Sequence, residues 1–333
     1  MNPEKSGESS SGFIVGIDEA GYGPLLGPYV IAAAAFHYRG KRPVESVSPA
    51  FWSSLGRAVS VSPDKNRVAV ADSKVLYRRT KGLRYLEEGV LAFLQARGAE
   101  PDSLRRLLVD LGEDPAELDR YPWYRDKDLP LPYATYRPVI ASFAQKLKQS
   151  FSRSAFSFLG IRAVVLRAGS FNDRLEAVGN KAAVALEALA GLLRQLFVSS
   201  RSQPCVVTVD RQGGRVHYAR FLFSAVKPKA ITIMAESPKE SVYRAVGRRG
   251  ENLVVRFCTE GEQSSLPVAL ASMTAKYVRE LHMELLNRYF RDSLGPSLKP
   301  TAGYVKDARR FLADIAPYIK SAPVPLELLV RHR

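Results

Sequence analysis

The order of hydrophobic and polar positions predicts a protein in which β-strands alternate with α-helices. Residues 13–17 and 29–36 form two apolar runs of strand length, separated by a turn rich in glycine and proline. Similar runs predict further strands at 68–71, 161–166, 205–209, 230–234 and 253–258. Apolar side chains at helical spacing predict helices at 72–94, 143–158, 171–197, 272–290 and 307–319. The pattern is that of an α/β fold with a central sheet.

Three segments fall outside this alternation and divide the chain. Residues 1–12 are polar and rich in serine, and we expect a disordered tail there. Residues 98–159 mix a short acidic helical pattern with a segment rich in aromatic residues and proline, and they predict a projecting insertion. Apart from this insertion, residues 13–320 are expected to form one domain, followed by a C-terminal tail at 321–333.

Local patterns also predict loops and a helix start. Polar residues at 39–67 and basic residues at 239–249 predict connections without regular structure. Asp72 and Ser73 stand directly before an apolar helical pattern, which favours a helix N-cap. The same helix carries a basic side that suits phosphate groups. Its basic residues are Lys74, Arg78, Arg79, Lys81 and Arg84.

The charge of the chain narrows the choice of partner. Lysine and arginine number 49 against 33 aspartate and glutamate, a formal net charge of +16. Such an excess favours nucleic acid or another polyanion, although a generally basic soluble protein has the same composition. Aromatic residues of the insertion could stack on bases, but anchoring the insertion to its own domain is their commoner role. They are Tyr121, Trp123, Tyr124, Tyr133 and Tyr136.

Cysteine and histidine content excludes several kinds of site. The two cysteines, Cys205 and Cys258, match neither a zinc-binding pattern nor a disulfide framework, which indicates a reducing compartment. Only four histidines occur, so a metal ion would have to be held by oxygen ligands. No stretch resembles a signal peptide or a membrane span, and we expect a cytoplasmic monomer without a membrane partner.

An acidic pair, Asp18 and Glu19, ends the first apolar run. Adjacent residues of a regular strand point to opposite faces, so the pair can serve one site only where the backbone departs from strand geometry. The glycines that follow would allow such a departure. Another acid, Asp210, ends the strand at 205–209, the place where an open α/β sheet puts its chemistry. Considered alone, each position is better explained as an ordinary strand-end residue.

The string at residues 18–28, DEAGYGPLLGP, resembles the opening motif of the type 2 ribonucleases H, the family of RNase HII and RNase HIII. Further blocks are similar to the family: DSK at 72–74, VVTVDRQGG at 206–214, and ASMTAKYVRE at 271–280. A GY segment that ends on Tyr304 is similar as well. The resemblance covers most of the chain between residues 13 and 316, apart from the insertion and the basic connection.

The resemblance implies a ribonuclease H-like α/β fold, a mixed central sheet flanked by helices. It also implies endonucleolytic hydrolysis of the RNA strand in RNA–DNA hybrids or ribonucleotide-containing duplexes, with two Mg²⁺ or Mn²⁺ ions and with 5′-phosphate and 3′-hydroxyl products. By motif, the catalytic and metal-binding acids are Asp18, Glu19, Asp210 and Glu280. The substrate-binding positions are Gly21, Tyr22, Gly23, Ser73, Lys74, Asn180, Lys276 and Tyr304.

Two of the departures from the family pattern remove a positive charge. Tyr22 stands where RNase HII typically has arginine, and Glu260 stands where it tends to have lysine. Loss of positive charge beside the substrate predicts a preference for long hybrids over single ribonucleotides. Two alternatives stay open: a non-catalytic protein that binds hybrids or duplexes, and a metal-dependent nuclease for another structured nucleic acid.

Overall fold

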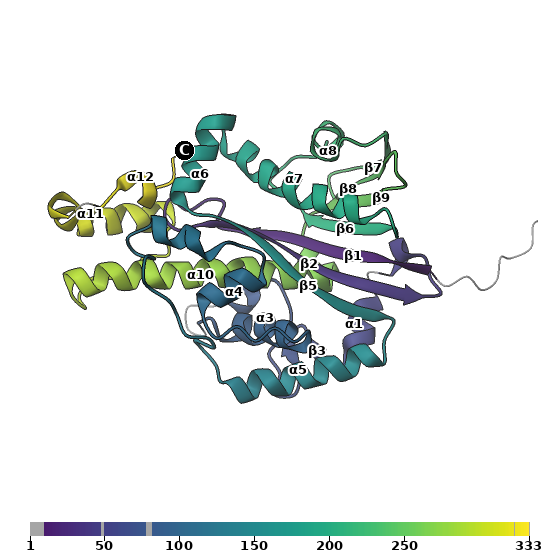
Figure 1. Ribbon diagram of the computed structural model, residues 1–333, viewed down its shortest axis with the longest axis horizontal. Helices are drawn as coiled ribbons and strands as arrows, with labels where there is room; N and C mark the ends of the chain where they lie inside the picture. The colour runs from purple at the N-terminus through teal and green to yellow at the C-terminus, as the bar shows by residue number, and fades with distance from the viewer. Residues whose placement is uncertain (1–9, 48–49, 78–81, 323, 333) are drawn as a thin grey trace, which may run out of the picture.

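The computed structural model describes residues 10–47, 50–77, 82–322 and 324–332. Its centre is a twisted sheet of seven strands in the order β5-β2-β1-β6-β9-β8-β7 (Figure 1). Strands β1, β6 and β9 run parallel and the other neighbouring pairs are antiparallel, so the sheet is mixed, as predicted. The seven strands are β1 (Ser10–Ala20), β2 (Tyr29–Gly40), β5 (Phe156–Leu166), β6 (Cys205–Asp210), β7 (Ala230–Glu236), β8 (Glu240–Val246) and β9 (Asn252–Cys258). Strands β3 (Val59–Ser60) and β4 (Val68–Ala69) form a separate pair.

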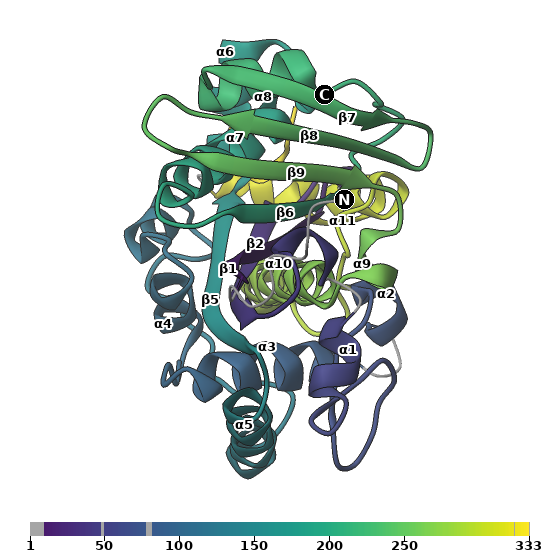
Figure 2. The same ribbon diagram turned by 90° about the vertical axis from the view of Figure 1, so that its right-hand side faces the viewer.

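Helices cover both faces of the large sheet (Figure 2). One core cluster joins alternate sheet residues such as Ile14 and Val30 to three helices: α10 (Leu266–Leu294), α3 (Arg84–Ala96) and α5 (Arg137–Ser152). The other cluster joins the intervening residues, such as Val15 and Ile31, to α6 (Ala168–Val178), α7 (Lys181–Ser199) and α8 (Ala219–Val226). The remaining helices are η1 (Val44–Ser46), α1 (Ala50–Leu55), α2 (Ser73–Leu76), α4 (Leu104–Asp110), η2 (Pro115–Arg120), α9 (Gly261–Ser264), α11 (Val305–Ser321) and α12 (Leu326–Leu329).

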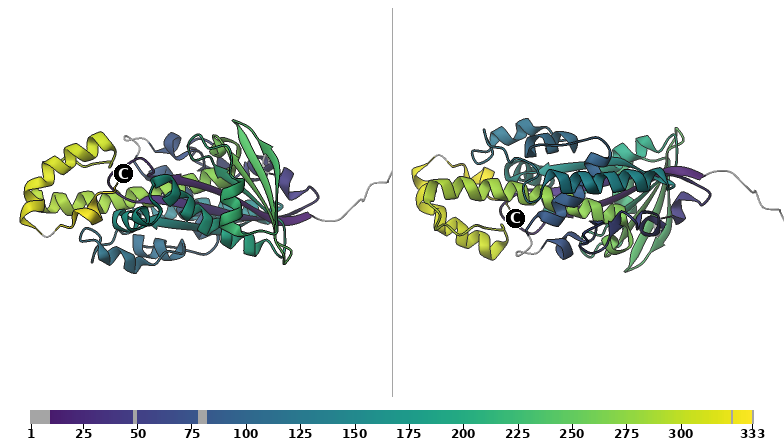
Figure 3. Two further views of the ribbon diagram at one scale, coloured as in Figure 1. Left: turned by 90° about the horizontal axis from the view of Figure 1, so that it is seen from above. Right: turned by 90° about the horizontal axis from the view of Figure 1, so that it is seen from below.

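Helix α10 is the element that sets the geometry of the site. It begins against Gly16 of β1, where an added Cβ would lie 2.1 Å from backbone atoms of Pro267 and Val268. Only glycine permits this approach, because any side chain would push the helix off the sheet. From there α10 follows β1 towards its carboxyl end and continues to the far end of the molecule, where α11 packs beside it (Figure 3).

The predicted insertion does not project; it belongs to the main core. Tyr121, Trp123 and Tyr124 are at most 1% exposed and lie in the α10 cluster. Trp123 stacks on Phe290 of α10 with ring centroids 6.4 Å apart. Anchoring was therefore the right interpretation of these aromatics, although they anchor the segment to the common core and not to a domain of its own.

Several boundaries differ from the prediction for local reasons. Strand β1 begins at Ser10, inside the predicted tail, and residues 1–9 lie outside the described chain. The helix predicted at 171–197 is two helices, because Gly179 is left-handed (φ 82°) and Asn180 caps α7 with a 2.9 Å hydrogen bond from a backbone N–H. Capping accounts for Asn180, and the structure adds no support for its predicted role in substrate binding.

Three further segments also gain or lose regular structure. The basic connection predicted at 239–249 is mostly strand β8, which pairs on both sides. The polar loop predicted at 39–67 contains α1, and the helix predicted at 143–158 ends at Ser152, before β5 begins.

Asp72 is an N-cap as predicted, with its carboxylate 2.9 Å from the backbone N of Lys74. The basic residues at 78–81 lie outside the described chain.

Helix α7 is long and apolar enough to cross a membrane by length and composition alone, with a mean hydropathy of 1.5. The same measure is met by core helices of soluble proteins, and the apolar side of α7 packs into the second core cluster. Packing against the sheet accounts for its composition.

Candidate active site

Acids gather where neighbouring parallel strands end. The last register pair of β1 and β6 is Ile17 with Val209, so Asp18 and Asp210 follow side by side. This confirms that the two acids lie on adjacent strands. Strand β9 continues the parallel set, and just after it the backbone N–H of Gly261 donates to Asp210 Oδ1 at 3.1 Å. The next residue, Glu262, is thereby brought to the same edge of the sheet.

Asp18 and Glu19 diverge, because strand β1 stays regular as far as Ala20. Asp18 turns towards α10, where Ser272 forms a hydrogen bond with its carboxylate. Glu19 turns to the other face and accepts hydrogen bonds from the Tyr29 hydroxyl and the Gln212 amide. The expected departure from strand geometry is therefore wrong, and the two carboxylates approach the edge of the sheet from opposite faces.

The electrostatics of this edge are those of crowded carboxylates. Burial and the charge of Asp210 raise the pKa of Asp18 well above its usual range. Burial also raises the pKa of Glu19, against the lowering effect of its two hydrogen bonds. Burial raises the pKa of Asp210, and burial together with the charge of Asp210 raises the pKa of Glu262 to about 7. The folded chain therefore holds these four acids close together at a cost in free energy.

The predicted fourth acid, Glu280, occupies a different environment. It accepts hydrogen bonds from Lys276 Nζ (2.7 Å), Arg279 Nη1 (2.7 Å) and the Tyr77 hydroxyl (2.9 Å). Burial acts to raise the pKa of Glu280, but the positive charges of Arg279 and Lys276 outweigh burial and lower this pKa. Glu280 lies eight residues beyond Ser272, about 12 Å along the helix axis at the usual rise per residue.

The assignment of Glu280 to the acidic site is therefore not supported by the structure. Its carboxylate is paired with Lys276 and Arg279 and does not join the crowded carboxylates at the strand ends. Glu284, one turn further along α10, pairs with Arg288 at 2.8 Å and is no substitute. The structure points instead to Glu262. Sequence reasoning passed over it, although an acid just after the third parallel strand repeats the placement of Asp18 and Asp210.

The short helix α2 brings polar groups to the acids. The hydroxyl groups of Ser272 and Ser73 form a hydrogen bond of 3.0 Å, which ties α2 to α10 beside Asp18. Although burial opposes it, the surrounding carboxylates raise the pKa of the exposed Lys74. They are the carboxylates of Asp72, Glu262, Asp18 and Asp210. Lys74 is thus an exposed cation beside the acids.

Lys276 is placed differently from Lys74. Its ammonium group pairs with Glu280 and lies 4.4 Å from the centre of the Tyr77 ring. With 15% of its side chain exposed, it is largely committed to these two partners. Its predicted contact with substrate would require it to leave them.

The glycine-rich turn lies beside the acids with its tip open. Gly21 has a left-handed φ of 86°, and within the described residues no atom lies within 4 Å of a Cβ added at Gly23. Tyr22 between them is 41% exposed, and its ring meets Tyr29 edge-on. Tyr304 is also exposed, with the Arg279 guanidinium 5.7 Å from its ring centre. These positions are accessible to a ligand that approaches the acids.

Whether the acids suit a metal ion depends on donor chemistry and geometry. Oxygen donors alone are what Mg²⁺ and Mn²⁺ prefer, and Glu262 Oε2 is buried without a hydrogen-bond partner among the described residues. In their present rotamers, no three Asp, Glu, His or Cys side chains of the described chain converge closely enough to hold an ion. The donor set therefore fits a divalent cation in kind, and binding would require side-chain rotation.

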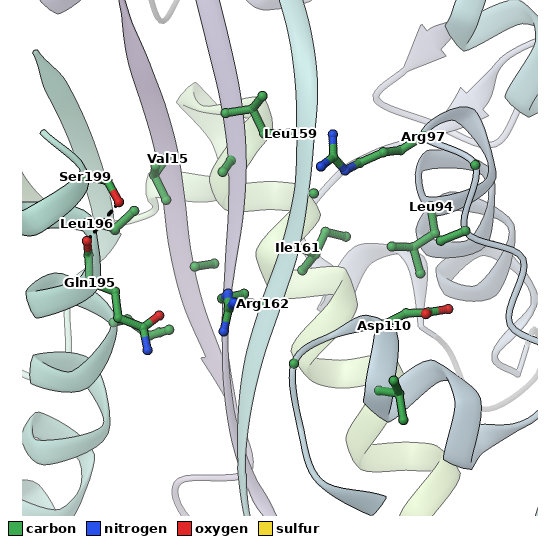
Figure 4. Close-up of a pocket in the computed structure, with 18 of the residues that line it drawn as sticks. Val15, Leu94, Arg97, Asp110, Leu159, Ile161, Arg162, Gln195, Leu196 and Ser199 are labelled. Carbon is green, nitrogen blue, oxygen red and sulfur yellow. Dashed lines mark hydrogen bonds between the residues drawn. The ribbon is translucent and has the colours of Figure 1, made fainter. Parts of the chain in front are cut away.

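Two cavities among the described residues lie away from the crowded acids. A cavity of about 590 Å³ lies over the sheet between α7 and the α3–α4 region, and Asp18, Glu19, Asp210 and Glu262 do not line it (Figure 4). A second, of about 340 Å³, is lined by residues that include Tyr77, Glu280 and Glu284.

No protein-family model matches the chain, and no curated protein matches its sequence. A solved structure of the PCNA:RNase HII complex from Archaeoglobus fulgidus is similar at 15% identity over 96% of this chain and 94% of that one, with a TM-score of 0.41. Bst-RNase HIII in complex with Mn²⁺ is similar at 15% identity over 97% and 67%, with a TM-score of 0.40.

The ribonuclease H2 from Pyrococcus horikoshii OT3 is similar at 14% identity over 95% of this chain and 92% of that one, with a TM-score of 0.38. Likeness at this level carries no argument about chemistry. The fold class rests on the chain itself, on its mixed sheet, the helices on both faces, and the acids at adjacent strand ends. The chain thus has the predicted α/β class, a mixed central sheet flanked by helices, and the three solved structures are those of an RNase HII, an RNase HIII and a ribonuclease H2.

Proposed function

We propose that the protein is a metal-dependent endonuclease that cleaves the RNA strand of RNA–DNA hybrids. The observation that carries this proposal is the set of crowded acids at the ends of β1 and β6 and just after β9, with raised pKa values for Asp18, Asp210 and Glu262. Carboxylates held together at a cost suggest a site built for a cation. The choice of substrate rests on the resemblance of the 18–28 motif.

Asp18, Asp210 and Glu262 would hold Mg²⁺ or Mn²⁺. Such ions, when bound, activate a water and stabilise the leaving 3′-oxygen in an in-line displacement. Glu19 is oriented by Tyr29 and Gln212 at the same edge. Lys74 would meet the phosphate backbone next to the acids, and the products would carry 5′-phosphate and 3′-hydroxyl ends.

Recognition of RNA would depend on the glycine-rich turn. A 2′-hydroxyl distinguishes RNA from DNA, and the backbone groups of Gly21 and Gly23 are the ones the family resemblance assigns to it. Tyr304 is exposed for packing on a neighbouring sugar. Tyr22 brings no positive charge, so we infer a preference for tracts of several ribonucleotides, on which other basic residues share the phosphate contacts.

Cleavage of defined duplexes tests the proposal. The protein and its Asp210→Asn variant are incubated with RNA–DNA, DNA–DNA and single-ribonucleotide duplexes, with Mg²⁺ or Mn²⁺. Glu284→Gln is the matched control, since it removes a carboxylate that pairs with Arg288. We expect hybrid cleavage that only Asp210→Asn abolishes. Cleavage of DNA–DNA would favour a nuclease for another substrate, and tight hybrid binding without cleavage would favour a non-catalytic protein.

A further inference from the structure

The glycine-rich turn, residues 21–27, accepts hydrogen bonds from Arg331, which is distant in sequence. Arg331 Nη2 donates to the carbonyl oxygen of Gly21 at 2.6 Å and also to that of Pro24. Its backbone N–H donates to Leu25 O at 2.9 Å, next to an isolated bridge between Leu26 and Val330. One residue thus contacts three carbonyl groups of the turn. The inward-facing carbonyls of this turn are fixed by residues outside it.

The segment that carries Arg331 is itself fastened to the fold. Residues 326–332, here called the strap, begin with α12 and lie against α6. The side chain of Asn172 on α6 donates to the carbonyls of Glu327 and Val330, each at 2.9 Å, and accepts from the His332 backbone N at 2.7 Å. Three hydrogen bonds from one amide fix the path of the strap independently of the turn.

Arg331 is costly to bury, which argues that it does more than fill space. It is 1% exposed, and among the described residues its Nε and Nη1 have no hydrogen-bond partner. Burial and the nearby charge of Arg279 lower the pKa of Arg331 to about 9, so it remains protonated at neutral pH. A buried cation with unpaired donors contributes little to stability. What it does provide is one buried donor group, Nη2, shared by two carbonyl oxygens of the turn.

We propose that the strap, through Arg331, sets the conformation of the glycine-rich turn for recognition of the ribose, and that Arg331 is a positioning residue for the cleavage reaction. The inference rests on the proposed function. Its physical basis is that backbone N–H groups can discriminate a 2′-hydroxyl only if the turn is held in one conformation.

Hydrogen exchange of the free protein tests the positioning without any substrate. Arg331→Met should raise the exchange rates of the Leu25 and Leu26 amides, which donate to the carbonyl oxygen of Gly303, about tenfold, because a charged hydrogen bond that holds the turn is lost. Arg331→Lys should restore part of the protection. His332→Ala is the matched control, since its side chain is exposed and only its backbone is used. Unchanged exchange in Arg331→Met would overturn the proposal.

Cleavage assays then test the link to ribose recognition. Arg331→Met should lower kcat on an RNA–DNA hybrid about tenfold, while its affinity for a DNA–DNA duplex stays unchanged. Increased exchange with unchanged kcat would refute the role in recognition. If Arg331→Met fails to fold, Asn172→Ala, which loosens the strap from the other side, should give the same pattern. If the wild type cleaves no hybrid, the proposed function fails, and the exchange experiment still decides whether the strap holds the turn.

Discussion

Replacing Glu262 or Glu280 by glutamine should change the stability of the metal-free protein in opposite directions. Burial and the charge of Asp210 raise the pKa of Glu262 from 4.5 to about 7, so between these values the folded state binds a proton that the unfolded state has lost. Stability must therefore fall as pH rises through this window. Above pH 7 the ionised Glu262 destabilises the folded chain.

The magnitude follows from the same shift. Each pKa unit corresponds to about 1.4 kcal/mol, so the full shift would be worth about 3 kcal/mol. Because part of this cost is relieved when the ionised side chains move apart, we expect Glu262→Gln to raise the free energy of unfolding by about 1–3 kcal/mol at pH 8. The gain should fade below pH 5, where the carboxyl group is protonated in both states.

Glu280→Gln should do the reverse. Arg279 and Lys276 lower the pKa of Glu280 against the effect of burial, so its ionised form stabilises the fold above pH 4.5 and this contribution is lost in acid. Arg279 is 1% exposed, and the loss of its carboxylate partner should cost about 3–5 kcal/mol at neutral pH.

Urea unfolding followed by circular dichroism, in EDTA from pH 5 to 8.5, measures both effects. Addition of Mg²⁺ should then stabilise the wild type more than Glu262→Gln, because a cation that binds only the folded state raises its stability. A loss of stability in Glu262→Gln at pH 8 would refute the account of carboxylate repulsion. Equal effects of the two substitutions would remove the distinction between the two acids.

Three further predictions concern other parts of the molecule. Tyr22→Arg should raise cleavage at single ribonucleotides relative to long hybrids roughly tenfold, the value of one charged hydrogen bond, and an unchanged ratio of kcat/KM would exclude Tyr22 as the determinant. Gly16→Ala should lower stability by about 3 kcal/mol in thermal unfolding, because its Cβ meets the backbone of α10. Trp123→Ala should cost about 3–5 kcal/mol, whereas the exposed Tyr136→Ala should be nearly neutral; equal losses would contradict the buried position of the insertion.

The sequence by itself determined the centre of the sheet. Strands β1, β6 and β9 are buried on both faces, so their residues form apolar runs that only a buried strand explains at that length. An acid at the end of each of the first two runs then predicted a shared edge. Local patterns also gave the Asp72 cap, because capping depends on near neighbours in the chain.

The tertiary structure decided which acids share that edge. The spacing of apolar residues in α10 predicts which side of the helix is buried. It does not predict the position of the helix along β1, which is set by the contact at Gly16. That position leaves Glu280 beside Arg279 and Lys276, while Glu262 meets Asp210. The directions of Asp18 and Glu19 likewise depended on whether pairing with β2 continued past the acids, which no local pattern reveals.

Long-range packing also decided the role of the two segments that looked peripheral. The aromatic residues of 98–159 have the same composition whether they face solvent or a core, and only contact with α10 shows that they are buried. The strap at 326–332 carries no pattern that points to residues 21–27, more than 300 positions away. Hydrogen bonds between such distant parts of a chain exist only once the fold has brought them together. The sequence therefore predicted Asp18, Glu19, Asp210 and the turn, whereas only the structure showed Glu262 and the contacts that hold the turn.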